Sequence, residues 1–354
     1  MTNKKVAVIG GAGFLSREIV TQLLDREDEV FVGDVDSDVS KGELPYHLSD
    51  KEREKRNAQL RLGRVDILDE KTFDNIPKGF DIVIQTAGYF NFWPINPERA
   101  WRINVHGTRD LVEHCLDNGV KDYLYYSSVE AVGSVKDRSE LPGAKESDVP
   151  LDRELRKSLY KRTKTRAHGL VGSYCERFNE KGKRLMMRAP STPIGKGMEK
   201  VPTGELITNT GKIIRFCAPN SVLSCIDTRD LARDDLLALD RGKNGETYVS
   251  VGYHAEIHDI LKVREKITGV RAPRFEMPRW SLIPIAMFME TLGRLNKDYK
   301  PQMTVEQAVR TRENHFYDTS ATRGRLGLSV DDYYQLEESV ENAVRYMKDR
   351  GILN

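Results

Sequence analysis

The chain has 354 residues, enough for two domains with a sizeable buried core. Its 56 Lys and Arg residues nearly balance 54 Asp and Glu residues, so the sequence indicates neither a basic surface for nucleic acid nor an acidic tail. We therefore expect a small molecule as the partner. The four cysteines form no CxxC pair and have no histidine at ligand spacing, so we predict no metal site.

The first predicted element is the apolar strand "KVAVIG", which leads through a glycine turn into a helix in "VAVIGGAGFLSREIV". The stretch lacks the small-residue cleavage site of a signal peptide, so we predict a cytoplasmic protein. Gly10 and Gly13 allow a sharp turn and let a pyrophosphate approach the helix N-terminus, where free N–H groups favour an anion. The pattern predicts a dinucleotide site.

The second predicted strand, "EVFVGD", ends at Asp34, 21 residues beyond Gly13. An acidic side chain at this place binds ribose hydroxyls and repels a 2′-phosphate. NAD is therefore the preferred cofactor and NADP the alternative. Asp36 is a rival for the same role.

Strand-like and helical segments continue to alternate through the first half, as in "FDIVIQTAG", "RDLVEHCLDNG" and "DYLYYSSVEAVG". This alternation predicts an α/β fold with a doubly wound, Rossmann-type parallel sheet. After Arg188, Pro and Gly become denser and helices dominate. We predict a dinucleotide-binding domain over residues 1–188, to which a strand near 221–227 returns. A smaller, mainly helical substrate-binding domain is expected over 189–354.

The segment "LYKRTKTRA", residues 159–167, carries four cations in nine positions. Tyr160 and Lys164 are four residues apart and share one face of a helix, where a tyrosine beside an ammonium group can become an acid–base catalyst. Lys161, Arg162 and Arg166 lie off this face, and we expect them to be solvated.

The longest apolar run, "WSLIPIAMFMETL" from Trp280 to Leu292, is shorter than the roughly 20 residues of a membrane-spanning helix, and Pro284 interrupts it. We predict no membrane span. A buried packing helix is the favoured interpretation. A helix that lines an apolar substrate pocket and a helix that contacts a membrane surface are the alternatives.

The motifs of the first half occur in the same order as in one known protein family. The sequence resembles the extended short-chain dehydrogenase/reductases, of the NAD-dependent epimerase/dehydratase and 3β-hydroxysteroid dehydrogenase type. The resemblance is specific over residues 4 to 200 and looser to about residue 345. Two residues depart from the family pattern. Ser16 replaces the third glycine of the loop, and Ile9 replaces the usual polar residue just before the loop. We expect a slightly altered helix approach. The matching motifs are "GGAGFLS", "VDILD", "QTAG", "NVHGT", "YYSSVEAVG" and the pair Tyr160 and Lys164.

The resemblance implies an NAD(P)-dependent oxidoreductase and most of its cofactor site. It places Asp66 and Ile67 at the adenine, beside the glycine turn and Asp34. Homodimers are common in the family, so the resemblance is compatible with a homodimer. The other implied cofactor contacts are Phe14, Leu15, Thr86, Ala87, Gly88, Asn104, Ser127, Tyr160, Lys164 and Pro190.

The catalytic residues also follow from the resemblance. About one Tyr-x3-Lys match is expected by chance from 14 tyrosines and 24 lysines, so this spacing alone decides nothing. The single match lies 32 residues after Ser128, where the family has its catalytic pair. Tyr160 would exchange a proton with the substrate and Ser128 would hold the substrate oxygen. Side chains alternate on a strand, so only one adjacent serine can face the site, and Ser127 is the alternative.

The tyrosine must lose its proton more readily than in water. Lowering a tyrosine pKa from about 10 to 7 takes about 4 kcal/mol. Lys164 and the positive nicotinamide ring are the expected sources, and Lys164 would also bind the ribose.

The segment "GYFNFW", residues 88–93, supplies an apolar wall that suits a ring-shaped or lipid-like substrate better than a diphosphate. The segment "RAPSTPIGKG" is similar to that of dihydroflavonol reductases and hopanoid-associated sugar epimerase-like proteins, and "SSVEAVG" to that of 3β-hydroxysteroid dehydrogenases. Ile194 precedes Gly195 where sugar-nucleotide members have a tyrosine. The expected substrate contacts are Tyr89, Phe92, Trp93, Ser128 and Thr192, with Phe90 in the same wall.

Three interpretations follow. The leading one is an NAD(P)-dependent enzyme that interconverts a secondary alcohol and a ketone on a cyclic, largely apolar compound such as a sterol or terpenoid. The second is a nucleotide-sugar epimerase or dehydratase, which takes and returns hydride within one turnover. The third is a dinucleotide-sensing protein without catalysis, which the intact Tyr160 and Lys164 pair disfavours.

Overall fold

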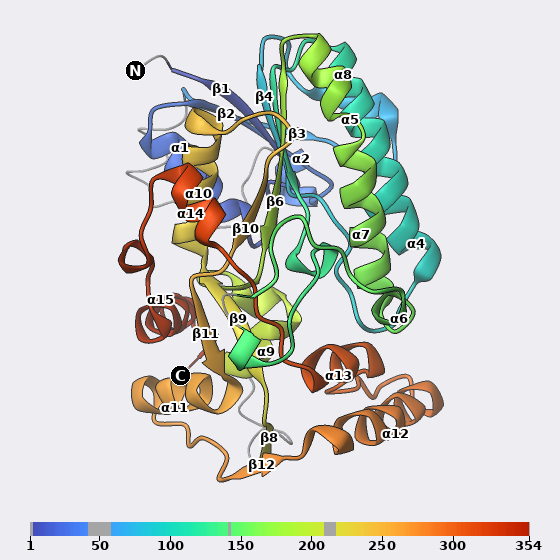
Figure 1. The fold of residues 1–354 in the computed structure, drawn as a ribbon, viewed down its shortest axis with the longest axis vertical. Helices are drawn as coiled ribbons and strands as arrows, with labels where there is room; N and C mark the ends of the chain where they lie inside the picture. Colours follow the sequence, from blue (N-terminus) through green and yellow to red (C-terminus); the bar gives the residue numbers. More distant parts are fainter. Residues whose placement is uncertain (1–2, 42–57, 141–142, 209–216, 354) are drawn as a thin grey trace.

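The computed structural model describes residues 3–41, 58–140, 143–208 and 217–353. Its main feature is a seven-stranded sheet in the order β10-β6-β5-β4-β1-β2-β3, and every neighbouring pair is parallel. The predicted doubly wound α/β fold is confirmed (Figure 1). The strands are β1 (Lys5–Ile9), β2 (Glu29–Asp34), β3 (Leu60–Arg64), β4 (Ile82–Gln85), β5 (Asp122–Tyr126), β6 (Arg184–Pro190) and β10 (Thr247–Ser250).

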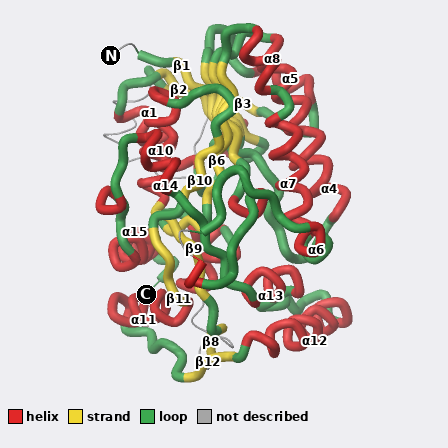
Figure 2. The backbone as a smooth tube through the Cα atoms, in the orientation of Figure 1, coloured by secondary structure: helices red, strands yellow, loops and turns green. Residues whose placement is uncertain are grey.

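Helices cover both faces of this sheet (Figures 1 and 2). Side chains of β1 alternate between the faces, as strand geometry requires. Val6 and Val8 enter one core with α1 and α10, while Ala7 and Ile9 enter the other core with α5 and α7. The covering helices are α1 (Ser16–Asp25), α10 (Thr228–Arg241) and α14 (Ser320–Leu326) on one face, and α4 (Pro97–Trp101), α5 (Thr108–Asp117), α7 (Leu159–Gly172) and α8 (Cys175–Glu180) on the other.

The expected return of residues 221–227 to the main sheet is wrong. Val222–Asp227 (β9) instead lies between β7 (Thr192–Ile194) and β11 (Tyr253–Glu256) in a separate three-stranded sheet. The strand that extends the main sheet is β10, which pairs with β6. Both segments are short and apolar, so composition could not tell which one would find the sheet edge.

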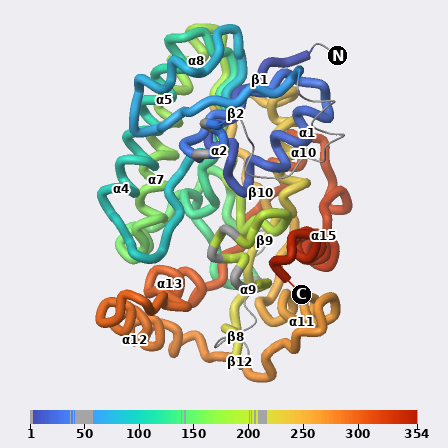
Figure 3. The backbone as a smooth tube through the Cα atoms, turned by 180° about the vertical axis from the view of Figure 1, so that it is seen from behind, coloured from blue at the N-terminus to red at the C-terminus, as the bar shows by residue number. Residues whose placement is uncertain are grey.

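The rest of the second half is largely helical, as predicted, and α15 packs on α11 at the end opposite the main sheet (Figure 3). The strands β8 and β12 pair in parallel and form a separate two-stranded sheet. These elements are α11 (Ile257–Thr268), α12 (Leu282–Leu295), α13 (Val305–Arg312), α15 (Leu336–Asp349), β8 (Cys217–Pro219) and β12 (Phe275–Met277). Short helices α2 (Ser37–Ser40), α6 (Asp152–Leu155) and α9 (Glu205–Thr208) complete the described α-helices, and several short 3₁₀ turns lie between them.

The apolar run that begins at Trp280 forms α12, which is buried on one face only. Leu282, Ala286 and Met289 pack inward, whereas the side chains of Met287 and Phe288 are 57% and 65% exposed. The favoured interpretation of a fully buried packing helix is therefore correct for half of the helix. Among the described residues, no helix is long and apolar enough to cross a membrane. The cytoplasmic placement stays a prediction.

The parallel register brings the functional segments to one edge. Ile9 at the end of β1 pairs with Gly33 of β2 and with Gln85 of β4. The carboxyl ends of these strands therefore align, as they do in open parallel sheets that bind ligands there.

Candidate active site

A cavity of about 420 Å³ lies at this edge, between the main sheet and the C-terminal region. It reaches from the glycine turn, past the start of α7, to α13. Most of the predicted site residues line it: Gly10, Gly13, Phe14, Leu15, Thr86, Gly88, Tyr89, Phe92, Ser127, Ser128, Tyr160, Lys164, Pro190 and Thr192.

The glycine turn is built for close backbone approach. Gly10 has φ +87°, and a Cβ there would lie 2.5 Å from the backbone nitrogen of Ala87. The hydroxyl of Ser16 donates to the Gly10 carbonyl oxygen at 2.8 Å and lies 2.7 Å from the Thr86 hydroxyl. The serine that replaces the third glycine thus ties the start of α1 to the turn. The cradle at the N-terminus of α1 fits a pyrophosphate.

Asp34 lies beside the glycine turn and is not part of the cavity wall. Its Oδ2 accepts a hydrogen bond from the Ala12 nitrogen at 2.9 Å, and its Oδ1 accepts one from the Asp36 nitrogen at 3.1 Å. Burial raises the pKa of Asp34, which these backbone donors counteract. The carboxylate of the rival, Asp36, accepts from the Asp38 nitrogen instead and lies on the following turn.

Two other predicted cofactor residues lie beside the cavity rather than in its wall. Asp66 accepts a hydrogen bond from the Leu68 nitrogen and pairs with Arg64 at 3.0 Å. Ile67 is buried, and its carbonyl oxygen would lie 2.4 Å from a Cβ at Gly107. The glycine of "NVHGT" therefore permits the close contact between this loop and the helix.

Asn104 shapes the loop at Gly88. It lies on a π-helical turn, Arg102–Gly107, a distortion that often marks functional sites. Its Oδ1 accepts from the Tyr89 nitrogen at 2.6 Å, and its Nδ2 donates to the Tyr89 carbonyl at 3.1 Å. A Cβ at Gly88 would lie 3.4 Å from both Asn104 Oδ1 and Lys164 Nζ. Asn104 and Ala87 thus support the cavity wall from behind.

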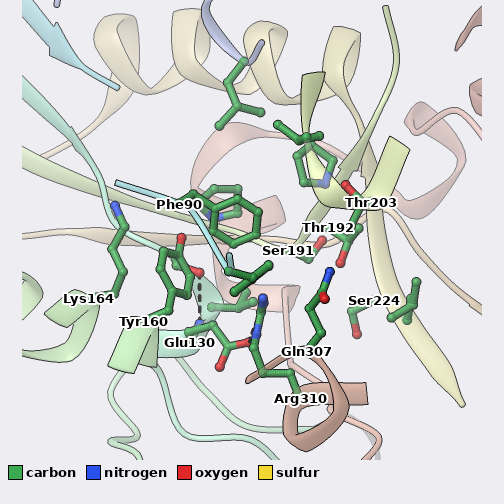
Figure 4. Close-up of a pocket in the computed structure, with 18 of the residues that line it drawn as sticks. Phe90, Glu130, Tyr160, Lys164, Ser191, Thr192, Thr203, Ser224, Gln307 and Arg310 are labelled. Atoms are coloured by element: carbon green, nitrogen blue, oxygen red, sulfur yellow. Dashed lines mark hydrogen bonds and ion pairs between the residues drawn. The ribbon is translucent and has the colours of Figure 1, made fainter. Parts of the chain in front are cut away.

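Helix α7 presents Tyr160 and Lys164 on one face, as predicted (Figure 4). Lys164 Nζ donates to the Tyr126 carbonyl oxygen at 2.9 Å and lies 5.5 Å from the Tyr125 ring centroid. Burial lowers the pKa of Lys164 to about 8. The ammonium is therefore buried and held by the end of β5.

The adjacent serines have different partners. Ser127 Oγ lies 2.9 Å from His168 Nδ1, one turn beyond Lys164 on α7. Ser128 Oγ accepts from the Glu130 nitrogen at 3.2 Å and caps a short 3₁₀ turn, Val129–Ala131. The Ser128 hydroxyl lowers the pKa of Tyr160, whereas the Ser127 hydroxyl is turned to His168, and this favours Ser128 over Ser127 as the residue that acts with Tyr160.

The cation that lowers the pKa of Tyr160 is Arg310, whereas Lys164 was expected in this role. Burial raises the pKa of Tyr160 to about 12, while Arg310 and the hydrogen bond with Ser128 lower it. The Arg310 guanidinium lies 5.3 Å from the Tyr160 ring centroid. Sequence reasoning missed Arg310 because it is 150 positions away and carries no motif.

Lys161 was expected in solvent, and this is wrong. Its side chain is 6% exposed and pairs with Glu130 at 3.3 Å and Glu154 at 3.7 Å. The helix-face argument placed it correctly off the Tyr160 face but ignored the loop that packs there. Arg162 and Arg166 are exposed, as predicted.

Not all aromatic residues of the segment after β4 line the cavity. Phe90 packs edge-to-face on Tyr160, with ring centroids 4.9 Å apart, and on Phe92 at 4.7 Å. Trp93 is outside the cavity wall, close to Gly293 of α12. Its predicted substrate contact is therefore not supported.

Comparison with models of protein families shows the family of this chain. Residues 7–222 match the model of the 3-beta hydroxysteroid dehydrogenase/isomerase family. The chain belongs to this family. The predicted enzyme class, an oxidoreductase of the extended short-chain dehydrogenase/reductase type, is confirmed.

Two curated relatives match most of the chain. A protein of Synechocystis sp. provisionally named dihydroflavonol 4-reductase is 26% identical, over 97% of this chain and 94% of its own length. Sterol demethylase protein B of Methylococcus capsulatus is 24% identical, over 81% and 85% respectively.

Solved structures share the fold across the whole length. The crystal structure of gox2253 superposes with a TM-score of 0.77 at 26% identity, covering 99% of this chain and 100% of that one. MoeE5 in complex with UDP-glucose and NAD has a TM-score of 0.73 at 18% identity, covering 98% and 99%. The second likeness shows the fold alone.

Proposed function

We propose that the chain is an NAD-dependent dehydrogenase or reductase that interconverts a secondary alcohol and a ketone on an uncharged, cyclic, largely apolar substrate. The observation that carries this proposal is the placement of Tyr160, Ser128 and Lys164 at one cavity with aromatic and aliphatic walls. Sterol-related names among the relatives support the substrate class.

The charges of the cavity disfavour a diphosphate. Among the described residues that line it, Lys164, Arg310 and His315 can carry positive charge. Arg310 is paired with Glu130 at 2.8 Å, and burial lowers the pKa of His315 to about 4, so it is neutral near pH 7. Lys164 faces the predicted cofactor. A diphosphate prefers several free cations, whereas a neutral ring compound requires none.

The cofactor end fits NAD. The turn at Gly10 and Gly13 would hold the pyrophosphate, Asp34 the ribose hydroxyls and Lys164 the second ribose. NAD, when bound, accepts or returns the hydride. NADP is the alternative that the carboxylate of Asp34 disfavours.

The chain's own residues handle the proton. In oxidation, Ser128 orients the substrate hydroxyl and the Tyr160 phenolate oxygen takes its proton. In reduction, the Tyr160 hydroxyl returns a proton to the carbonyl oxygen. Phe90 and Phe92 exclude water from this region, which strengthens each electrostatic contact.

The test is turnover of a substrate panel with purified protein. NAD⁺ or NADP⁺ would be mixed with a 3β-hydroxysteroid, a cyclic terpenol or a UDP-sugar, with nicotinamide absorbance and product followed together. We expect net reduced cofactor with a cyclic alcohol, preferentially with NAD⁺. Tyr160→Phe should lose at least about a hundredfold in rate, whereas Tyr334→Phe, which alters an exposed tyrosine outside the cavity wall, should not.

Other outcomes name the competing functions. Sugar conversion without net reduction would identify an epimerase. Turnover that survives Tyr160→Phe would contradict the proposed mechanism. Cofactor binding without turnover across the panel would indicate the sensing protein, and size-exclusion chromatography of the same sample would test for a homodimer.

A further inference from the structure

The start of the catalytic helix is held by a carboxylate from a distant part of the chain. Glu306 on α13 accepts hydrogen bonds from the backbone nitrogens of Leu159 at 3.1 Å and Tyr160 at 3.2 Å, and from the Ser158 hydroxyl. The first N–H groups of a helix have no partner within it, and a negative charge there is favoured by the helix dipole. Glu306 is 8% exposed, so this contact is shielded from water.

One helical turn later, the same face of α13 carries Arg310. Its Nε and Nη2 both lie 2.8 Å from Glu130 Oε1. The guanidinium lies 5.3 Å from the ring centroid of Tyr160 and 5.6 Å from that of Phe90 (Figure 4). Glu130 follows Ser128 by two residues, so α13 contacts both segments that carry the proposed proton chemistry.

The cation of Arg310 acts more strongly on the pKa of Tyr160 than the carboxylate of Glu130 does. Burial alone would raise the pKa of Glu130, but Arg310 and Lys161 hold it well below its usual range. Lys161 is shared between Glu130 and Glu154, and Arg310 is the partner of Glu130 that lies beside the phenol ring. The charged and polar groups around Tyr160 are Arg310, Glu130, Ser128, Lys164, Tyr125 and Glu306.

We propose that Glu306 and Arg310 are positioning residues for Tyr160: Glu306 fixes the first turn of α7, and Arg310 keeps a cation beside the phenol ring. The inference rests on the proposed acid–base role of Tyr160. It adds that the C-terminal region, in addition to binding substrate, sets the reactivity of a tyrosine in the first half of the chain.

The charge of Arg310 is tested by titrating Tyr160 directly. Protein labelled with ¹³C at tyrosine Cζ, in saturating NAD⁺, would be followed by NMR between pH 6 and 10.5, with Tyr160→Phe to assign the signal. Arg310→Gln should raise the midpoint of the Tyr160 signal by about one pH unit, or move it beyond the range. Arg310→Lys should restore most of the shift. Arg312→Gln, an exposed arginine two positions on, is the matched control and should leave the midpoint unchanged.

The same variants give a kinetic readout with the active member of the substrate panel. In oxidation the phenolate is required, so the log of kcat/KM rises with pH and levels off above the Tyr160 pKa. Arg310→Gln should displace this limb to higher pH, with about a tenfold loss at pH 7 that recovers toward pH 10. A variant that had only lost packing would be slower by the same factor at every pH.

The cap is tested by amide hydrogen exchange. Glu306→Gln should speed exchange of the amides of Leu159 and Tyr160 by about tenfold, while amides late in α7 keep their rates. Glu337→Gln, in the exposed first turn of α15, is the control.

The two failures are distinguishable. If Tyr160→Phe is inactive but the Tyr160 signal has the same midpoint in Arg310→Gln as in Arg312→Gln, the inference is wrong and the proposed function stands. If Tyr160→Phe remains active, the proposed function itself is wrong. Equal exchange rates in Glu306→Gln and Glu337→Gln would overturn the capping role.

Discussion

Asp34 and Ala12 are joined by a hydrogen bond of 2.9 Å from the backbone nitrogen of Ala12 to the carboxylate of Asp34. The end of β2 is thereby tied to the glycine turn, and the negative charge is fixed where the predicted ribose lies. Asp34→Asn keeps an acceptor for the Ala12 nitrogen but removes the charge that repels a 2′-phosphate. We expect the ratio of kcat/KM for NAD⁺ over NADP⁺ to fall by about tenfold or more.

Asp36→Asn is the matched control for this prediction. Asp36 is the sequence-based rival, but its carboxylate accepts from the Asp38 nitrogen, whereas the Ala12 nitrogen of the turn donates to Asp34. Its cofactor ratio should stay within about twofold of the wild-type value. A larger change in Asp36→Asn than in Asp34→Asn would assign cofactor selection to Asp36.

The space around Gly10 predicts a strong effect of one methyl group. Gly10→Ala combines a φ of +87° with a contact of 2.5 Å to backbone, so the turn must shift. We expect a loss of more than about 2 kcal/mol in unfolding free energy and at least tenfold in NAD⁺ affinity. Gly79→Ala has a similar φ of +83° but nothing within 4 Å, so it should cost about 1 kcal/mol and leave affinity unchanged. Urea unfolding and fluorescence titration measure both, and equal effects at the two sites would contradict the close-approach argument.

The largest fully buried side chain, Arg188, predicts a stability effect. It pairs with Asp235 at 2.8 Å and Asp234 at 3.5 Å, all three inaccessible to solvent. Arg188→Met leaves the buried carboxylate of Asp235 without its cation, while Asp234 keeps Arg233 at 2.9 Å, and we expect a loss of about 3 to 5 kcal/mol in unfolding free energy. Arg345→Ala breaks an exposed pair with Glu341 and should cost less than about 0.5 kcal/mol. A loss for Arg188→Met as small as that for Arg345→Ala would show that the carboxylates are neutralised in another way.

Two histidines of lowered pKa should make the protein less stable in mild acid. Burial lowers the pKa of His168 and of His315 from 6.5 to about 4. Below pH 6.5 these two histidines become protonated in the unfolded chain. In the folded chain they stay neutral until the pH falls to about 4. Their contribution to stability is therefore complete above pH 6.5 and is lost as the pH falls toward 4.

Urea unfolding at pH 7.5, 6 and 5 measures this effect. His315→Gln should flatten the decline in unfolding free energy between pH 7.5 and 5. His106→Gln alters an exposed histidine and should leave the slope as it is. Parallel slopes for all three proteins would exclude His315 as a source of the acid sensitivity.

The parts of the site that the sequence predicts are those carried by contiguous motifs. Gly10, Asp34, Ser128 and Tyr160 each sit at a strand end or on a helix face, and the parallel register then brings them together. Local pattern and sheet topology suffice for such residues.

The remaining parts depend on contacts between distant segments. Glu306 reaches the Tyr160 nitrogen across 146 positions, and Arg310 reaches Glu130 across 180. Lys161 looked solvated because its own helix gives no sign of Glu130 and Glu154. The misplaced return of residues 221–227 has the same origin, since a short apolar strand fits more than one sheet edge.

The capping of α7 by Glu306 has a consequence for the order in which the protein matures on the ribosome. By the time Lys164 has emerged, the chain already holds its glycine turn, Asp34 and the Tyr160 and Lys164 pair. The carboxylate that completes the first turn of α7 is made about 140 residues later, which is roughly 7 to 30 s at ordinary rates of synthesis. A nascent or truncated chain that ends before α13 carries the glycine turn and Asp34 but lacks the carboxylate that caps α7 and the arginine beside Tyr160. On the proposed mechanism, its proton-transfer centre is incomplete until α13 has been made.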